Sequence, residues 1–144
     1  MSLTNKKGFT LVELLIAAAI LAFAMSGILL MFINCAFLDQ ANRNKSIAAT
    51  HAEFVMEDIM EYMRSGDIVP LQDDIDDGTW TWGDSATIST KLGCASSSVL
   101  NSESITTAYV DETNPLDVTV TVSWKDRAQA NARDLTLETL ISKR

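Results

Sequence analysis

The sequence predicts an α+β protein in which a long N-terminal helix packs on a small antiparallel β-sheet. The first half of this helix is transmembrane in character and the second half is amphipathic. Three observations support the prediction. An uncharged run of 20 residues extends from Leu14 to Ile33. A helical pattern follows between Asp39 and Arg64, and alternating β patterns occupy the C-terminal third of the chain.

The composition shows that apolar and acidic residues are segregated along the chain. Of the 144 residues, 47% are hydrophobic, yet 19 acidic residues against 11 basic ones give a net charge of -8. Residues 65–116 carry nine acids and one base, and so hold most of the acidic excess. A chain this apolar is not globally disordered. A chain this acidic lacks the basic face that a nucleic-acid backbone requires, so we expect no nucleic-acid partner.

The apolar run is long enough to cross a membrane. At about 1.5 Å of rise per residue, its helical length is roughly 30 Å, which matches the hydrocarbon core of a bilayer. Lys6 and Lys7 precede the run without an accompanying acid. The distribution of positive charge therefore predicts a cytoplasmic N-terminus and places the remainder of the chain outside. Gly27 is the weakest helical position within the run.

The helical pattern continues beyond the apolar run without a strong break. Apolar or aromatic side chains repeat every four residues, at Ile47, His51, Val55 and Ile59. We therefore expect one continuous helix from about residue 9 to residue 64, ended by Ser65 and Gly66. His51 is predicted to be a packed, hydrogen-bonded histidine. It is the single histidine of the chain, which removes most histidine-based catalytic sites.

Two period-2 patterns predict a β-hairpin near the C-terminus. Hydrophobic side chains alternate with polar ones across residues 118–124 and again across residues 135–141. Residues 79–82 and 87–90 are weaker strand candidates within a middle segment that otherwise predicts loops. A small antiparallel sheet laid on the amphipathic half-helix would bury the valine and leucine faces of the hairpin.

A specific motif stands directly before the apolar run. Residues 6–13 read KKGFTLVE: a basic leader, a glycine, an aromatic residue and a glutamate at the fifth position after the glycine. Through this motif and the apolar helix, roughly residues 6–38, the sequence resembles the type IV pilin and pseudopilin family. A carboxylate inside an apolar span costs about 2.5–3.5 kcal/mol on insertion scales. Glu13 therefore needs a partner.

The resemblance implies how the N-terminus is processed and used. A prepilin peptidase would cut between Gly8 and Phe9 and methylate the new amine of Phe9. Glu13 would then form a salt bridge with the Phe9 amine of a neighbouring subunit during assembly. The resemblance also divides the chain into a removed leader (residues 1–8), a transmembrane and filament-core helix (9–38) and an extracytoplasmic pilin-like head (39–144).

The role implied by the resemblance is structural, with no enzymatic activity, no cofactor and no metal. The chain would lie in the bacterial inner membrane before assembly and in a filament of pilins or pseudopilins afterwards. A single cysteine in the head, Cys94, excludes the head disulfide typical of major pilins and so favours a minor subunit or a pseudopilin. The strand patterns resemble the minor pilin called the pilus modification protein, slightly ahead of minor pseudopilin I of type II secretion. A pilus-associated adhesin or DNA-uptake subunit is the alternative from another class.

Two simpler interpretations of the apolar run are weighed against this one. An ordinary secretory signal peptide could be cleaved after Ala24, but Glu13 would then lie within its hydrophobic region. A plain signal anchor explains the apolar run but gives Glu13 no purpose.

Three smaller features carry weaker predictions. Cys35 and Cys94 could form a disulfide in an oxidising compartment, although the helical rise beyond Cys35 opposes a bridge. Trp80 and Trp82 could contact a partner or pack in a core. The acidic residues 73–77 are interpreted as a solvated turn, because their order breaks the spacing of a calcium-binding loop.

Overall fold

The computed structural model describes residues 9–65, 68–110, 115–126 and 132–142. The chain divides into two compact units, Met1–Asp39 and Gln40–Arg144. Where it is described, the first unit is helical from Leu11 onward, and the second unit contains a β-sheet and short helices.

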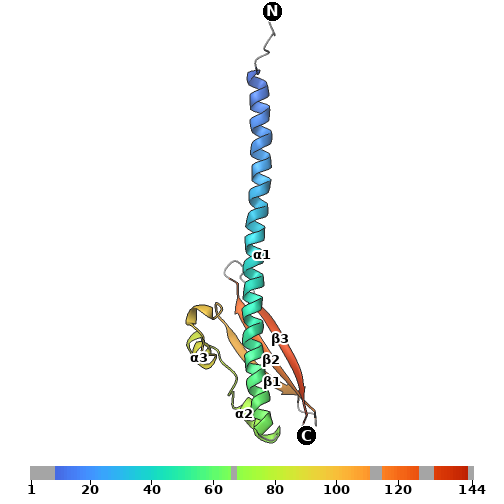
Figure 1. Ribbon diagram of the computed structural model, residues 1–144, viewed down its shortest axis with the longest axis vertical. Coiled ribbons are helices and arrows are strands. Elements are labelled where there is room, and N and C mark those ends of the chain that lie inside the picture. Colours follow the sequence, from blue (N-terminus) through green and yellow to red (C-terminus); the bar gives the residue numbers. More distant parts are fainter. Residues whose placement is uncertain (1–8, 66–67, 111–114, 127–131, 143–144) are drawn as a thin grey trace, which may run out of the picture. The chain divides into compact units, whose positions relative to one another are not determined.

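Helix α1 (Leu11–Ser65) is a single α-helix of 55 residues that belongs to both units (Figure 1). The side-chain oxygen of Thr10 accepts a hydrogen bond from the backbone N–H of Glu13 at 3.2 Å, and this contact caps the first turn. The helix ends at Ser65, next to the predicted stop. The predicted continuous helix is therefore confirmed, with a start two residues later than expected.

The part of α1 in the first unit has an apolar surface on all sides. Large hydrophobic side chains from Phe9 to Leu38 are exposed, and Phe23 reaches 84%. By length and composition, α1 is the helix among the described residues that could cross a membrane. A surface of this kind needs an apolar environment outside the chain, because water does not favour so large an exposed apolar area.

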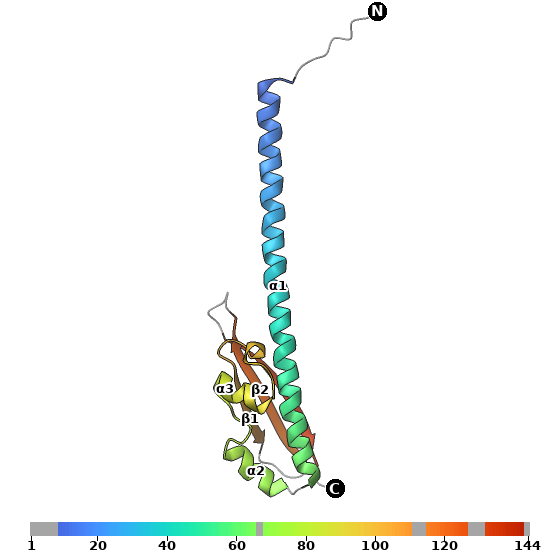
Figure 2. The same ribbon diagram turned by 60° about the vertical axis from the view of Figure 1, so that its left-hand side comes forward.

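The second unit is built on a three-stranded antiparallel sheet in the order β1-β2-β3 (Figure 2). Its strands are β1 (Ser104–Val110), β2 (Leu116–Lys125) and β3 (Ala132–Ile141). β2 and β3 pair with Val120 opposite Leu137, which confirms the predicted hairpin and with it the α+β class. β1 adds a strand that no specific sequence pattern had indicated.

The core lies between the last part of α1 and one face of the sheet. β2 shows strict alternation, and its core-facing side chains are Leu116, Val118, Val120, Val122 and Trp124. α1 faces them with fully buried Ala48, Ala52, Val55 and Ile59. The buried face of α1 is therefore slightly displaced from the face predicted by the four-residue repeat. Ile47 of that repeat is only partly buried, and Phe54, on the flank of the predicted face, is 44% exposed.

The middle segment is more helical than the sequence suggested. It contains α2 (Ile68–Asp76), α3 (Ser85–Lys91) and the short 3-10 helix η1 (Ser96–Ser98). The prediction of a strand at residues 87–90 was wrong, because these residues form most of α3. The prediction at residues 79–82 was also wrong apart from Trp82, which makes one isolated bridge to Ile105.

Candidate processing and assembly site

The residues predicted for processing and assembly flank the start of α1. Gly8 lies outside the described residues, and Phe9 is 80% exposed just before the helix. Glu13 occupies the first turn of α1, where the positive end of the helix dipole favours a carboxylate. The backbone N–H of Glu13 donates a hydrogen bond to the side-chain oxygen of Thr10, a contact that was not predicted from the sequence. The Thr-x-x-Glu spacing of a capping box was the signal that could have revealed this contact.

Glu13 is surrounded by apolar side chains on the helix surface. Its neighbours Leu11, Val12 and Leu14 are each more than 60% exposed. Within the described residues, Glu13 has no ion-pair partner. An apolar environment around this turn would therefore leave its carboxylate without a counter-charge unless another molecule supplies one.

The two tryptophans proposed as partner contacts are buried in the head. Trp80 is 3% exposed and its indole N–H donates to Asp58 at 2.7 Å. Trp82 is 7% exposed and donates to the carbonyl of Thr79 at 3.0 Å. Tyr62 packs edge-on against Trp80, with ring centroids 5.5 Å apart. The structure thus favours core packing over a contact surface for both tryptophans.

The two cysteines are free thiols. Cys35 is exposed on α1 in the first unit, and Cys94 is half-buried in the second unit. The disulfide considered from the sequence is not formed in this structure. Neither thiol therefore contributes a covalent link to the described fold.

His51 is buried as predicted, and its partner is Glu103, which sequence reasoning missed. His51 is 7% exposed and Glu103 is 1% exposed. The imidazole Nδ1 lies 2.6 Å from Oε1 of Glu103, and Oε2 of the same carboxylate accepts the backbone N–H of Leu100 at 2.6 Å. This arrangement joins α1 to the loop before β1 and satisfies both buried groups. Because both side chains are buried, the contact forms part of the packing between α1 and this loop.

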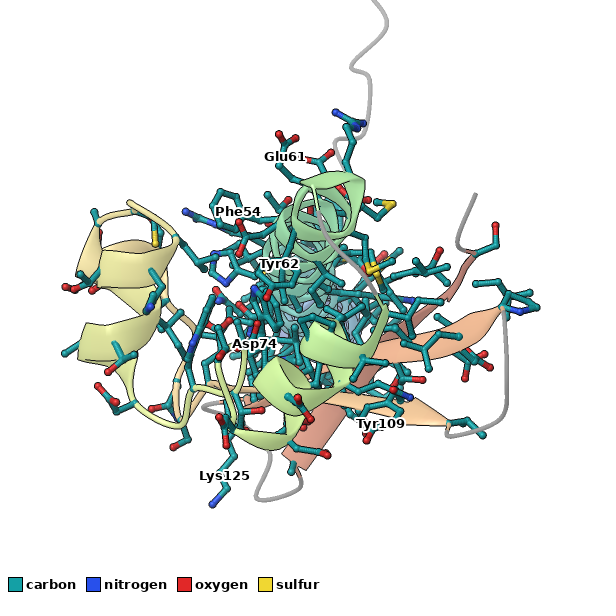
Figure 3. The ribbon with its side chains drawn as sticks, turned by 90° about the horizontal axis from the view of Figure 1, so that it is seen from below. Phe54, Glu61, Tyr62, Asp74, Tyr109 and Lys125 are labelled. Carbon is teal, nitrogen blue, oxygen red and sulfur yellow. The ribbon has the colours of Figure 1, made fainter. Side chains whose placement is uncertain are left out.

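Some carboxylates of the acidic middle segment accept hydrogen bonds from other parts of the fold. Among the described residues, no three His, Cys, Asp or Glu side chains are placed to hold a metal ion. Asp76 accepts a hydrogen bond from the Tyr109 hydroxyl at 2.9 Å. Tyr62 of α1 and Asp74 of α2 lie at the same end of the head (Figure 3). A hydrogen bond to Asp74, assisted by burial and by the negative charge of Asp74, raises the pKa of Tyr62 above its usual value.

The raised pKa of Tyr62 predicts a loss of stability in strongly alkaline solution. The contact with Asp74 stabilises the fold while the hydroxyl is protonated, so its contribution is complete below the ordinary tyrosine pKa of about 10. This contribution is lost as the pH rises through the higher pKa of the folded state. We expect the tyrosinate absorbance of Tyr62, measured as the difference between the wild type and Tyr62→Phe, to rise at a higher pH than that of an ordinary tyrosine.

Asp74→Asn is the matched control for this titration. An asparagine keeps a hydrogen-bond acceptor at the same position but removes the charge, so the pKa of Tyr62 should fall toward its usual value. A wild-type Tyr62 that titrates at or below the ordinary tyrosine value would contradict the contact.

Comparison with known proteins adds evidence at the N-terminus. Residues 3–29 match the family model described as the prokaryotic N-terminal methylation motif. No curated protein and no solved structure matches the chain. The matched segment covers Phe9, Glu13 and most of the exposed apolar surface of α1. The motif supports a type IV pilin-like protein, and the apolar part of α1 is long enough to anchor such a protein in a membrane.

Proposed function

We propose that this chain is a minor structural subunit of a type IV pilus that takes part in assembly or initiation of the filament. The observation that carries the proposal is the methylation motif at residues 3–29, which overlaps the part of α1 whose large apolar side chains, from Leu11 to Leu38, are exposed. Such a helix needs lipid before assembly and the apolar core of a filament afterwards. A head with a core of its own fits a subunit that is displayed outside the membrane.

Processing in this proposal removes residues 1–8. A prepilin peptidase cuts between Gly8 and Phe9, where the absent side chain of glycine leaves the scissile bond accessible. The same enzyme methylates the new amine of Phe9. Phe9 lies only two residues before the first residue of α1, so cleavage places the new amine close to the start of the helix.

Assembly in this proposal depends on Glu13. The carboxylate pairs with the Phe9 amine of a neighbouring subunit, which supplies the counter-charge that the described residues lack. In surroundings of low dielectric, such a pair specifies the axial register of the helices more than it adds stability. Residues 9–38 form the transmembrane and filament-core helix, and residues 39–144 form the extracytoplasmic head.

The choice of a minor pilus subunit depends on the head. A chain with one head cysteine lacks the disulfide of a major pilin head. A minor pseudopilin of a type II secretion system would share the same processing and the same use of Glu13. The adhesin alternative is disfavoured, because its proposed contact residues, Trp80 and Trp82, are buried. DNA uptake is disfavoured by the acidic head.

Mass spectrometry of the mature protein tests the processing step. We expect an N-terminus at Phe9 that carries one added methyl group, because the peptidase both cleaves and methylates. An intact Met1 would contradict processing. An N-terminus at Met25 would instead show cleavage of an ordinary signal peptide after Ala24.

Deletion of the gene in the native host separates the two filament systems. A pilus subunit predicts fewer or no surface pili with normal secretion of exoproteins. Restored piliation with the wild-type gene, but not with a Glu13→Ala gene, links the defect to this chain. Loss of exoprotein secretion with normal piliation would assign the chain to a secretion pseudopilus instead.

A further inference from the structure

Within the described part of the chain, no strand pairs with the outer edge of β3, which forms one edge of the sheet. The opposite edge differs, because Trp82 and Ile105 exchange two backbone hydrogen bonds of 2.8 Å at the outer side of β1. Soluble proteins usually shield long edge strands with proline, bulges or a covering segment. β3 has ten residues in continuous register and no proline, so its protection is limited to the charged side chains of Arg133, Asp134 and Glu138.

The register identifies the backbone groups that point outward. Both polar backbone groups of Ile105 bind Trp82, so they point away from β2. Val122, opposite Ile105, must therefore direct its backbone groups toward Leu135 of β3. The hydrogen bond from Lys125 N–H to the Asn101 carbonyl supports the same alternation, since odd-numbered residues of β2 face the side of β1.

Alternation along β3 then leaves every second residue with unpaired backbone groups. Residues hydrogen-bonded to β2 are Leu135, Leu137 and Thr139. Residues whose N–H and C=O point outward are Asp134, Thr136, Glu138 and Leu140. The side chains of these four are all exposed and share the solvent face of the sheet. A strand added at this edge would place its own side chains directly opposite them.

We propose that the outer edge of β3 binds an extended segment of a neighbouring filament subunit as a fourth, antiparallel strand. The spacing of donors and acceptors selects an extended backbone as the occupant. Asp134 and Glu138 select lysine or arginine at the two positions that face them, and the 68% exposed Leu140 selects an apolar residue. The inference rests on the proposed function, because it needs another subunit beside this one.

The outward-facing residues of a second β3 strand include no lysine or arginine, so a second copy of this chain offers no opposite charge to Asp134 or Glu138. Antiparallel pairing of two β3 strands about Thr136 would place Asp134 of each strand opposite Glu138 of the other. Like charges in directly opposite positions destabilise a strand pair. The charge of this edge therefore points to a different subunit with a basic strand.

The test uses the full chain in detergent micelles and a short acetylated peptide that alternates threonine with valine or lysine. The lysines are placed to face Asp134 and Glu138. We expect saturable binding of the labelled peptide by fluorescence anisotropy. Amide hydrogen exchange should slow at Thr136 and Glu138, whose N–H groups point outward. It should change little at Leu137, whose N–H already binds β2.

Two variants separate backbone pairing from side-chain contacts. Thr136→Pro removes an outward N–H without removing a ladder bond to β2, and prolines are tolerated at such edge positions. It should abolish peptide binding, while the matched Thr136→Ala should bind nearly as well as the wild type. Glu138→Lys should weaken binding by about twofold to fivefold. A peptide with glutamate in the facing position should restore the affinity of this variant.

The results distinguish this inference from the proposed function. Near-ultraviolet circular dichroism of the buried tryptophans checks that each variant is folded, and Glu138→Lys tests the edge even if the proline variant unfolds. No binding by a folded chain whose Phe9 is methylated would overturn the inference and leave the proposed function intact. Binding that is insensitive to Glu138→Lys, or protection at β1 instead of β3, would also overturn it.

Discussion

Replacing Glu13 by alanine should prevent incorporation of this subunit into filaments while cleavage after Gly8 continues. The proposed cut precedes Phe9, four residues before Glu13, so we expect the peptidase to act without the carboxylate. The proposed assembly does need the carboxylate, because a neighbour's amine would otherwise be buried without a counter-charge. Removing one member of a buried ion pair costs about 3–5 kcal/mol, more than a hundredfold in an equilibrium constant. Immunoblots of sheared filaments and of membranes should show processed subunit only in the membranes.

Conservative variants identify the charge as the cause. Glu13→Gln keeps the size and polarity of the side chain but removes the charge, so it should fail like Glu13→Ala. Glu13→Asp keeps the charge on a shorter side chain and should assemble in part. All three variants keep the backbone N–H that binds Thr10, so the cap of α1 is preserved. Normal incorporation of Glu13→Ala would remove the role that we assign to this residue.

The elements that the sequence predicted correctly are those in which local pattern and burial agree. Leu14 to Ile33 contains no charge and favours helix throughout, and no later residue before Ser65 breaks α1. β2 alternates valine with threonine, and the structure buries the valines while the threonines face outward. In both cases the residue pattern that the element requires, an apolar run for α1 and alternation for β2, was visible in one short window.

The helix α3 shows why the weaker strand prediction failed. Its threonines favour strands by propensity, but Asp84 precedes them at the N-cap position. The carboxylate of Asp84 accepts the backbone N–H of Thr87 at 2.8 Å and its hydroxyl at 2.6 Å. These two hydrogen bonds lower the pKa of Asp84 and fix the first turn of a helix. A capping residue therefore outweighed strand propensity in a segment too short to show a period.

The partners in the head could not be predicted, because they depend on contacts distant in sequence. Trp80 and Trp82 alternate with threonines, which suggested a strand with one aromatic face. Trp80 instead donates its indole N–H to Asp58 of α1, and Trp82 makes a single bridge to Ile105 of β1. The role of Glu103 was equally hidden, since nothing around it distinguishes a buried acid from a solvated one. Its partner His51 is 52 residues away along the chain.

The His51–Glu103 pair links α1 to the loop before β1 at a position where water is excluded. The side chain of Glu103 is fully buried, and that of His51 is 9% exposed. Each oxygen of the carboxylate has one partner, His51 for Oε1 and the Leu100 N–H for Oε2. Within the described residues, every buried side-chain nitrogen and oxygen atom has a hydrogen-bond partner, so the His51–Glu103 network is fully satisfied. Loss of one member therefore leaves a buried polar group unsatisfied, a large cost for one substitution.

His51→Leu should destabilise the head by about 3–5 kcal/mol, because it leaves the buried Glu103 carboxylate without its hydrogen-bond partner from α1. Glu103→Gln should cost only about 1 kcal/mol, since an amide can both accept the Leu100 N–H and donate to His51. The double variant His51→Leu with Glu103→Leu should be more stable than His51→Leu alone, because it buries no unpaired charge. Thermal unfolding of the full chain in micelles, followed by near-ultraviolet circular dichroism of the tryptophans, measures all three, and Glu53→Gln on the exposed face of α1 is the control. A double variant less stable than His51→Leu would show that the pair contributes through packing and not through charge.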